Sequence, residues 1–196
     1  MNNKRIYILN GHPAQKSLSK ALLESYADAA REAGHEVRMA HLHDMEFDSD
    51  YGFAGYTTYK PLEPVLEKVL NDLEWCEHLV MSTPLWWGGL PAKLKGLFDR
   101  AFLPGRVFDT QVTKFGIPSP MLAGRTARVI VTSDTPNLFM RLLYKNAVHH
   151  QLRKQIFGFI GFKPTRIIQF SGASHAKPAA VERWLKQVRK IGASAS

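Results

Sequence analysis

The sequence contains one cysteine and no long apolar run, and both absences limit what the chain can be. Cys76 cannot form a disulfide within the chain, so we expect a reducing compartment, the cytoplasm. No apolar run approaches the roughly 18–20 residues that span a membrane. The apolar stretch near the amino terminus, about four residues long, is too short for a signal peptide. We therefore expect a cytoplasmic chain that is not an integral membrane protein.

Acidic residues are scarce in the second half of the chain. Residues 101–196 contain 15 Lys and Arg but only Asp109, Asp134 and Glu182, and the whole chain has a net charge of +9. Such asymmetry indicates an anionic partner: a nucleic acid, a membrane surface or a small molecule. The cations are scattered and match no nucleic-acid-binding motif, so we expect no nucleic acid. A solvated basic face and peripheral docking on an acidic surface both remain open.

Motifs for metal and nucleophilic chemistry are also missing. No Cys and His spacing is typical of a zinc site, and no GxSxG elbow is present. Cys76 ends a predicted helix, where a structural role is the simpler interpretation. We predict no metal site.

Five short runs, either apolar and β-branched or alternating between apolar and polar residues, are separated by segments of helical period. The runs predict strands over residues 5–10, 36–42, 78–83, 126–133 and 165–170. The segments predict a helix from Ser17 or Ser19 to Gly34, and helices over 62–75, 91–102, 138–160 (interrupted at 158–161) and 178–191. Residues 44–61 predict an irregular excursion that contains Phe47, Tyr51, Phe53, Tyr56 and Tyr59.

This alternation predicts an α/β fold, with a mostly parallel sheet and helices on both of its faces. No linker or repeat divides the chain, so we expect a single domain over residues 1–196. In such sheets ligands bind beyond the carboxyl ends of the strands, near the point where the strand order reverses. Three loops follow strands at that edge: residues 10–19, 84–90 and 132–137.

The first loop leads into a predicted helix, and the amino end of a helix favours anions. Lys16 adds a cation, and His12, Ser17 and Ser19 add hydrogen-bond donors. Neither GxxxxGK[ST] nor GxGxxG is present, so a phosphate would be held without a glycine-rich cradle. The alternative is that Ser17 or Ser19 serves only as a helix cap.

The second loop, PLWWGGLP, places two tryptophans between a strand and a helix that begins with proline. Gly88 and Gly89 permit close backbone approach, and indole rings in this position can stack on a planar ligand. The alternative is that one of Trp86 and Trp87 packs against the adjacent helix. The third loop, TSDTPN, carries small hydrogen-bonding side chains that suit the polar edge of a heterocycle or that cap the next helix.

Two segments, NGHP…KSLSKAL and TPLWWGGLPAKLKGLFDRAF, together with the strand–helix order, resemble the flavodoxin-like NAD(P)H:quinone oxidoreductases. That group includes quinone reductases, modulator-of-drug-activity-type enzymes and ancillary flavoproteins of potassium-efflux systems. The resemblance implies a doubly wound, five-stranded parallel sheet of order 2-1-3-4-5 that carries a non-covalent flavin. It also implies a homodimer with the flavin near the subunit interface.

The resemblance assigns the three loops to parts of the flavin. The residues that match the surroundings of the flavin phosphate are His12, Ser17, Leu18 and Ser19. Those that match the loop lining the isoalloxazine ring are Pro84, Leu85, Trp86, Trp87 and Gly88. The third flavin loop matches Thr132, Ser133, Asp134, Thr135 and Pro136, where many quinone reductases have Thr-Thr-Gly-Gly. The candidates for the family's Tyr/His pair near the flavin are Tyr144, His149 and His150.

The implied activity is the two-electron, hydride-type reduction of quinones or similar planar acceptors by NAD(P)H, with ping-pong kinetics. We favour FMN over FAD because no adenine-specific feature is present, although the 44–61 excursion can cover either an adenine or a substrate. One alternative is a flavin-bearing regulatory subunit of a membrane transporter, suggested by the basic second half. The other is an electron-transfer flavodoxin, which the positive net charge disfavours.

Overall fold

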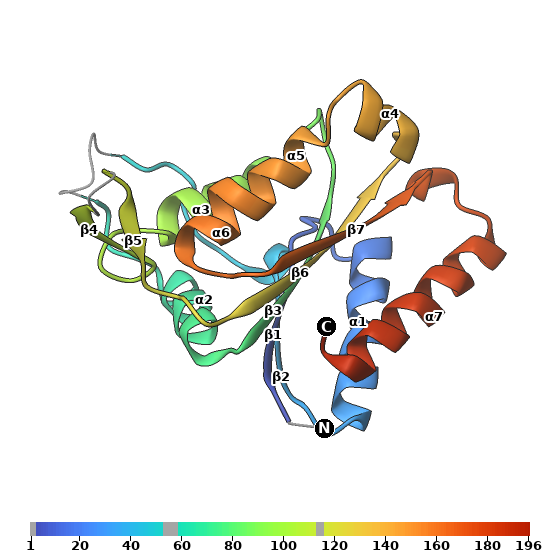
Figure 1. The fold of residues 1–196 in the computed structure, drawn as a ribbon, viewed down its shortest axis with the longest axis horizontal. Helices are drawn as coiled ribbons and strands as arrows, with labels where there is room; N and C mark the ends of the chain where they lie inside the picture. Colours follow the sequence, from blue (N-terminus) through green and yellow to red (C-terminus); the bar gives the residue numbers. More distant parts are fainter. Residues whose placement is uncertain (1–2, 53–58, 113–115) are drawn as a thin grey trace.

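The computed structural model describes residues 3–52, 59–112 and 116–196 and has a five-stranded parallel sheet at its centre (Figure 1). The strand order is β2-β1-β3-β6-β7, which is the predicted order 2-1-3-4-5 when only the sheet strands are counted. The fold class is therefore confirmed. The strands are β1 (Arg5–Asn10), β2 (Glu36–His41), β3 (His78–Pro84), β6 (Thr126–Ser133) and β7 (Thr165–Ser171).

Helices cover both faces of the sheet (Figure 1). One face carries α1 (Leu18–Glu32) and α7 (Pro178–Ser194), which pack against each other. The other face carries α2 (Pro64–Trp75), α3 (Ala92–Ala101) and a run formed by α5 (Ala147–His150), the π-helical η2 (Gln151–Ile156) and α6 (Phe157–Ile160). The remaining helical turns are η1 (Leu42–Asp44), α4 (Asn137–Leu142) and η3 (Ala173–His175).

Successive strand residues supply two separate cores. Ile8 and Val80 pack with Leu22 of α1 on one side of the sheet, while Leu9 and Met81 belong to the core on the other side. All five side chains are at most 2% exposed. A strand that is buried on both faces reads as a continuous apolar run, which is why these strands were predictable.

The first helix begins at the earlier of its two candidate caps. The Ser17 Oγ accepts a hydrogen bond of 3.1 Å from the amide of Lys20, so Ser17 is the cap and Ser19 lies inside α1. Gly34 follows the helix with a φ of +87°, a conformation that glycine adopts at little cost. Both ends of α1 therefore follow from local sequence.

The predicted break at residues 158–161 is wrong in position. Gly158 lies within α6, and Gly161, with a φ of +114°, ends that helix. The interruption comes earlier, at Lys145 and Asn146, whose φ values of +48° and +51° separate α4 from α5. The helical period continues through this turn, so the left-handed pair left no signal in the pattern of apolar residues.

An antiparallel pair of short strands follows α3 and was not predicted. It consists of β4 (Phe108–Val112) and β5 (Pro118–Pro120). Prolines at both ends of β5 and its length of three residues leave no alternation to detect. This pair lies outside the central sheet.

A buried arginine fastens the 44–61 excursion to α3. Arg100 is 2% exposed, and its guanidinium donates to the Glu63 carboxylate at 3.0 Å and to the carbonyl oxygens of Pro61 and Asp48. The described part of the excursion is thus held by a charged side chain as well as by apolar packing.

Two features bear on the expected cellular context. In the part of the chain that the structure describes, no helix is long and apolar enough to cross a bilayer. Cys76 is 1% exposed, and burial raises the pKa of its thiol to about 12. The thiol therefore stays protonated and unreactive at neutral pH.

The buried imidazole of His78 makes stability depend on pH. Burial lowers the pKa of His78 from 6.5 to about 3, and its Nδ1 hydrogen bonds with the Thr126 hydroxyl at 2.7 Å. The unfolded chain therefore binds one more proton than the folded chain between about pH 3 and 6.5. We predict that this proton lowers the free energy of unfolding by about 1.4 kcal/mol per pH unit below about pH 5.5.

Urea unfolding of the wild type and His78→Leu at several pH values between 7 and about 4.5 measures this difference. The variant loses the Thr126 hydrogen bond at every pH. The two proteins are therefore compared by the slope of the free energy of unfolding against pH and not by its absolute value. Equal slopes in the two proteins would show that His78 is protonated in the folded state.

Candidate site at the carboxyl edge of the sheet

The three loops selected from the sequence meet at the carboxyl ends of β1, β3 and β6, around a cavity of about 280 Å³. We call this the strand-end cavity. A fourth loop, after β7, completes it with Ala173 and Ser174. Its lining residues are His12, Lys16, Ser17, Leu18, Ser19, Pro84, Leu85, Trp86, Thr132, Ser133, Asp134, Ala173 and Ser174.

One wall of this cavity is the amino end of α1. The amides of Leu18 and Ser19, the first two helical residues, make no hydrogen bond to any described residue. Lys16 is exposed beside them and forms no ion pair within the described chain. Two free amides, the positive end of a 15-residue helix and an unpaired lysine together make an anion-binding corner.

His12 is held as a neutral hydrogen-bond donor at the cavity wall. Its Nδ1 accepts a 3.0 Å hydrogen bond from the Ala14 amide, and its own amide donates to Asn10 Oδ1 at 3.2 Å. Burial lowers the pKa of the imidazole. The ring proton therefore sits on Nε2, which remains available to a ligand.

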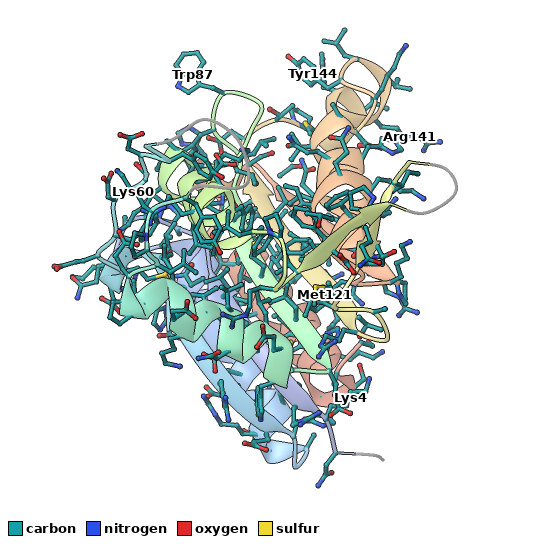
Figure 2. The ribbon with its side chains drawn as sticks, turned by 90° about the vertical axis from the view of Figure 1, so that its left-hand side faces the viewer. Lys4, Lys60, Trp87, Met121, Arg141 and Tyr144 are labelled. Carbon is teal, nitrogen blue, oxygen red and sulfur yellow. The ribbon has the colours of Figure 1, made fainter. Side chains whose placement is uncertain are left out.

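Trp86 and Trp87 occupy a tight hairpin turn, and the turn separates their roles. The amides and carbonyls of Trp86 and Gly89 are paired at 3.0 and 2.9 Å, and the two central residues, Trp87 and Gly88, have φ values of +50° and +73°. These are the features of a type I′ turn. The Trp86 ring meets the His12 ring edge-on at 5.7 Å, whereas Trp87 is fully exposed at the tip (Figure 2).

The turn also presents two unused donors. The amides of Trp87 and Gly88 form no hydrogen bond with another described residue. Leu85, which precedes the turn, donates its amide to the Thr132 carbonyl at 2.9 Å and so ties the second loop to β6. The predicted alternative, in which one indole packs against the adjacent helix, does not hold for Trp87, which is fully exposed. Trp86 is 46% exposed, and its ring contacts His12.

The third loop is joined to its neighbours by hydroxyl groups. Buried Ser19 and Thr132 share a hydrogen bond of 3.3 Å between α1 and β6. Asp134 accepts hydrogen bonds from the Ser174 amide at 2.8 Å and from the Ser174 hydroxyl. Those bonds lower the pKa of the Asp134 carboxyl, so the acid stays ionised and directed to the β7 loop.

A second cavity, of about 520 Å³, adjoins the first because Leu85 lines both. We call it the Tyr144 cavity. It contains four more of the predicted residues, Trp87, Gly88, Thr135 and Tyr144. Its full lining is Leu85, Trp87, Gly88, Thr135, Met140, Tyr144, Ala147 and Val148. Figure 2 shows Trp87 and Tyr144 at the same end of the molecule.

Three predicted site residues line neither cavity. Pro136 is exposed and precedes α4, and His150 is exposed on α5. His149 lies behind the third loop, where its Nε2 donates to Gln169 Oε1 at 2.8 Å and Gln169 Nε2 donates to Ser133 Oγ at 3.0 Å. Burial lowers the pKa of His149, which fits this neutral, donating state. His149 thus supports Ser133 rather than facing the cavity.

Comparison with known proteins agrees with the fold. The family described as "Flavodoxin-like fold" matches residues 4–191. The chain belongs to this family. The solved NAD(P)H:quinone oxidoreductase from Methanothermobacter marburgensis superimposes with a TM-score of 0.82 and 22% identity, over 100% of both chains.

Several curated relatives of this flavodoxin-like chain have oxidoreductase names. NAD(P)H dehydrogenase [quinone] 1 of Rattus norvegicus is 24% identical over 96% of the chain and 77% of its own length. An FMN-dependent NADH:quinone oxidoreductase of Ruegeria pomeroyi is 25% identical over 85% and 88%. The ribosyldihydronicotinamide dehydrogenase-like protein traD of Penicillium crustosum is 27% identical over 52% of the chain, which spans only 45% of that relative.

The sequence prediction missed residues from two places. Ala173 and Ser174 follow the fifth sheet strand, so the rule that selected the other loops also selects theirs. Met140, Ala147 and Val148 lie on either side of the left-handed turn between α4 and α5, which no sequence signal marked. Ala173 and Ser174 could therefore have been predicted from the sequence, whereas the residues around the left-handed turn could not.

The aromatic residues of the 44–61 excursion do not build a wall of the strand-end cavity where the structure describes them. Phe47 packs against the core, and neither Tyr51 nor Tyr59 lines either of the two cavities. Phe53 and Tyr56 lie outside the described residues. Within the described chain, no group of three or more His, Cys, Asp or Glu side chains is arranged to hold a metal ion.

The left-handed conformation of Trp87 has an energetic cost without a packing gain in the isolated chain. A non-glycine residue in this region is strained by about 1–2 kcal/mol, and Asn-Gly is the preferred pair for a type I′ turn. We predict that Trp87→Asn raises the free energy of unfolding by about 0.5–1 kcal/mol. Chemical denaturation of the cofactor-free wild type and variant measures this difference in the free energy of unfolding.

Trp86→Asn is the matched control, because it changes the neighbouring indole at a position outside the left-handed region. This variant loses the edge-on contact with His12, and no stabilisation is expected. A lower stability for Trp87→Asn than for the wild type would mean that the Trp87 ring packs on the protein.

Proposed function

We propose that this protein is an FMN-containing oxidoreductase that reduces quinones or similar planar acceptors by two electrons at the expense of NAD(P)H. The observation that carries the proposal is the junction of the two cavities at Leu85, with an anion-binding corner at one end and exposed turn amides at the other. The quinone oxidoreductase names of the relatives support the same activity. The protein works in the cytoplasm as one flavin-binding domain over residues 1–196.

The phosphate of FMN occupies the corner at the start of α1. The free amides of Leu18 and Ser19 donate to its oxygens, Lys16 neutralises its charge, and His12 Nε2 adds a donor. FMN is favoured over FAD because the described part of the 44–61 excursion offers no ring beside the strand-end cavity. A relative of similar length is FMN-dependent by name.

The Trp86–Gly89 turn would hold the ring end of the flavin. The free amides of Trp87 and Gly88 would donate to the polar edge of the ring, where negative charge builds up on reduction. Gln169 holds the Ser133 hydroxyl, and His149 fixes Gln169 in turn, so the third loop presents a fixed set of hydrogen-bonding groups.

A bound flavin would supply the hydride transfer from NAD(P)H to the acceptor. The Tyr144 cavity holds the nicotinamide donor and then the acceptor in turn, because it is the ligand-sized space beside Leu85. Tyr144 and Met140 wall that space and orient a planar ring. The acceptor would receive the hydride and would take one further proton from solvent, to which Tyr144 is half exposed. Sequential occupancy of one cavity predicts ping-pong kinetics.

Reconstitution with FMN, followed by assay of quinone-dependent NAD(P)H oxidation, tests the function. Gly88→Val disturbs the turn and should weaken FMN binding by about two- to tenfold, since a lost hydrogen bond between neutral groups costs about 0.5–1.5 kcal/mol. The control is Gly124→Val, because Gly88 and Gly124 have similar φ values (+73° and +84°) and no atom within 4 Å of an added Cβ. The control should bind FMN as tightly as the wild type. Its double-reciprocal plots of initial rate should give parallel lines, as ping-pong kinetics requires. No flavin binding, or equal losses in both variants, would refute the proposal.

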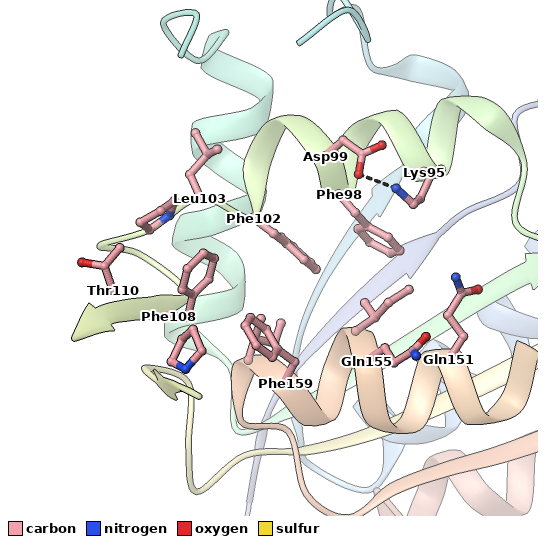
Figure 3. Close-up of a pocket in the computed structure, with 14 residues that line it drawn as sticks. Lys95, Phe98, Asp99, Phe102, Leu103, Phe108, Thr110, Gln151, Gln155 and Phe159 are labelled. Carbon is pink, nitrogen blue, oxygen red and sulfur yellow. Dashed lines mark hydrogen bonds and ion pairs between the residues drawn. The ribbon is translucent and has the colours of Figure 1, made fainter. Parts of the chain in front are cut away.

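We further propose that the protein forms a homodimer whose interface covers α4 and an apolar groove beside it. Leu138, Phe139, Leu142, Leu143 and Tyr144 are each more than half exposed, which is unusual for a contiguous patch on a monomer. The groove, of about 530 Å³, lies between α3 and the η2–α6 run. Figure 3 shows Phe98, Phe102, Phe108 and Phe159 in it, with the Lys95–Asp99 ion pair at its edge. A partner on this surface would close the Tyr144 cavity.

Leu142→Glu should convert the dimer to a monomer, because it buries a carboxylate in the apolar interface. Light scattering coupled to size-exclusion chromatography measures the mass. Gln187→Glu adds the same charge at an exposed position of α7 and should leave the dimer intact. A wild-type mass of about 22 kDa at assay concentration would contradict the dimer.

A further inference from the structure

A basic groove of about 640 Å³ lies at the end of the sheet opposite the candidate site. It surrounds the first residues of β6 and β7, whereas the strand-end cavity lies beyond their last residues, about 20 Å away along β7. Five of its lining residues are cations and none is acidic. The lining comprises Arg128, Arg153, Lys154, Lys163, Pro164, Thr165, Arg166 and Ile167.

A smaller cavity extends the basic groove toward Lys4, sharing Pro164 and Arg166 with it. Figure 2 shows Lys4 at the end of the molecule opposite Trp87 and Tyr144. Part of the positive charge in the second half of the chain therefore lies at one end of the sheet.

Two of the five cations are direct neighbours. Arg128 and Arg166 are register partners on the adjacent strands β6 and β7, which places their Cα atoms about 5 Å apart on the same face of the sheet. Arg128 is partly buried, and burial lowers the pKa of its guanidinium, as does the neighbouring charge of Arg166. Like charges on neighbouring side chains repel each other, and an anion between them relieves this repulsion.

None of the five cations forms an ion pair with the side chain of a described Asp or Glu. Arg128 Nε donates to a main-chain oxygen of Ser196, the last residue of the sequence, at 2.8 Å, and Arg153 Nε donates to the Thr165 carbonyl at 3.2 Å. The terminal guanidinium nitrogens of both arginines form no hydrogen bond with another described residue. Arg106, by contrast, contacts two glutamates at 2.7 and 2.9 Å.

Protection of the sheet edge does not account for this cluster. β7 is an edge strand, and cations on edge strands prevent pairing with other chains. That role explains Arg166 but not Arg128, which lies on the inner strand β6 and is partly buried. A second arginine turned to the same place points to a ligand.

We propose that the basic groove is a second binding site, for a soluble compound that carries two or more phosphoryl groups. Arginine forks match phosphate oxygens in pairs, and the lysines add point charges around them. The volume is that of a small-molecule site. No aromatic residue lines the groove, so the site recognises charge rather than a ring. Membrane-binding surfaces pair cations with exposed apolar side chains, and Ile167 is only partly exposed here.

Titration of the FMN-loaded protein with inorganic triphosphate tests the proposal, because FMN then fills the anion-binding corner of α1. Lys163→Gln/Arg166→Gln removes two exposed cations of the groove without touching Arg128. We expect triphosphate to bind to the wild type and to bind at least about tenfold more weakly to this variant, as for the loss of a charge-assisted contact. Arg183→Gln/Lys186→Gln removes the same charge from exposed positions on α7 and should bind like the wild type.

Four results would overturn the proposal. Equal losses in both variants would reveal only general electrostatic attraction. Monophosphate binding as tightly as triphosphate would show a site for a single anion. Binding of a single-stranded oligonucleotide, or of vesicles of anionic phospholipid, without binding of triphosphate would assign the groove to a nucleic acid or a membrane. Absence of all binding would show that the groove is an edge-protecting surface.

Discussion

The parallel register of the central sheet is the constraint on which the candidate site depends. It pairs Asn10 with Ser82, Pro84 with Thr132, and Ser133 with Ser171, so loops that are far apart in the chain begin at one edge. The middle of each strand is apolar, but this edge carries buried polar groups, including Asn10 and Ser82 at 0% exposure. A shift of one residue would move those groups into the apolar core, because side chains alternate between faces. The same burial that stabilises the sheet therefore fixes the geometry of the four loops.

Charge divides the molecule along the strand direction. At the carboxyl edge, the cavity combines a helix amino end and Lys16 with Asp134, whose charge is already engaged by Ser174. At the opposite edge, the basic groove has cations and no acid. The acids of the first half are largely used to hold structure, as Glu63 does for Arg100. Unpaired positive charge thus remains at both ends of the sheet, in one case beside a helix terminus and in the other around paired strands.

Most of the fold followed from the sequence because its signals are local. β-branched runs bounded by Gly or Pro specified the strands, and Ser17 and Gly34 specified both ends of α1. The loops after β1, β3 and β6 followed from topology, and they do meet around one cavity. The predictions that failed concern a backbone turn and a tertiary contact, which leave no signal in the local sequence. The left-handed turn at residues 145–146 breaks no apolar period, and the role of His149 depends on its contact with Gln169, twenty residues away. Trp86 and Trp87 differ in exposure because they occupy different positions of a type I′ turn. This turn requires positive φ values at its two central residues, and the pair Trp-Gly is not a sequence signal for it.

We propose above that the start of α1 binds the phosphate of a flavin whose ring end is held by the Trp86–Gly89 turn. The most direct measurement is the affinity of the cofactor-free protein for FMN and for riboflavin, followed by quenching of flavin fluorescence. Riboflavin has the same ring but lacks the phosphate. The account predicts that FMN binds at least about 100-fold more tightly, since two charge-assisted hydrogen bonds contribute about 1.5–3 kcal/mol each. Lys16→Ala should reduce the ratio of the affinity for FMN to the affinity for riboflavin. Equal affinities for FMN and riboflavin would contradict the account.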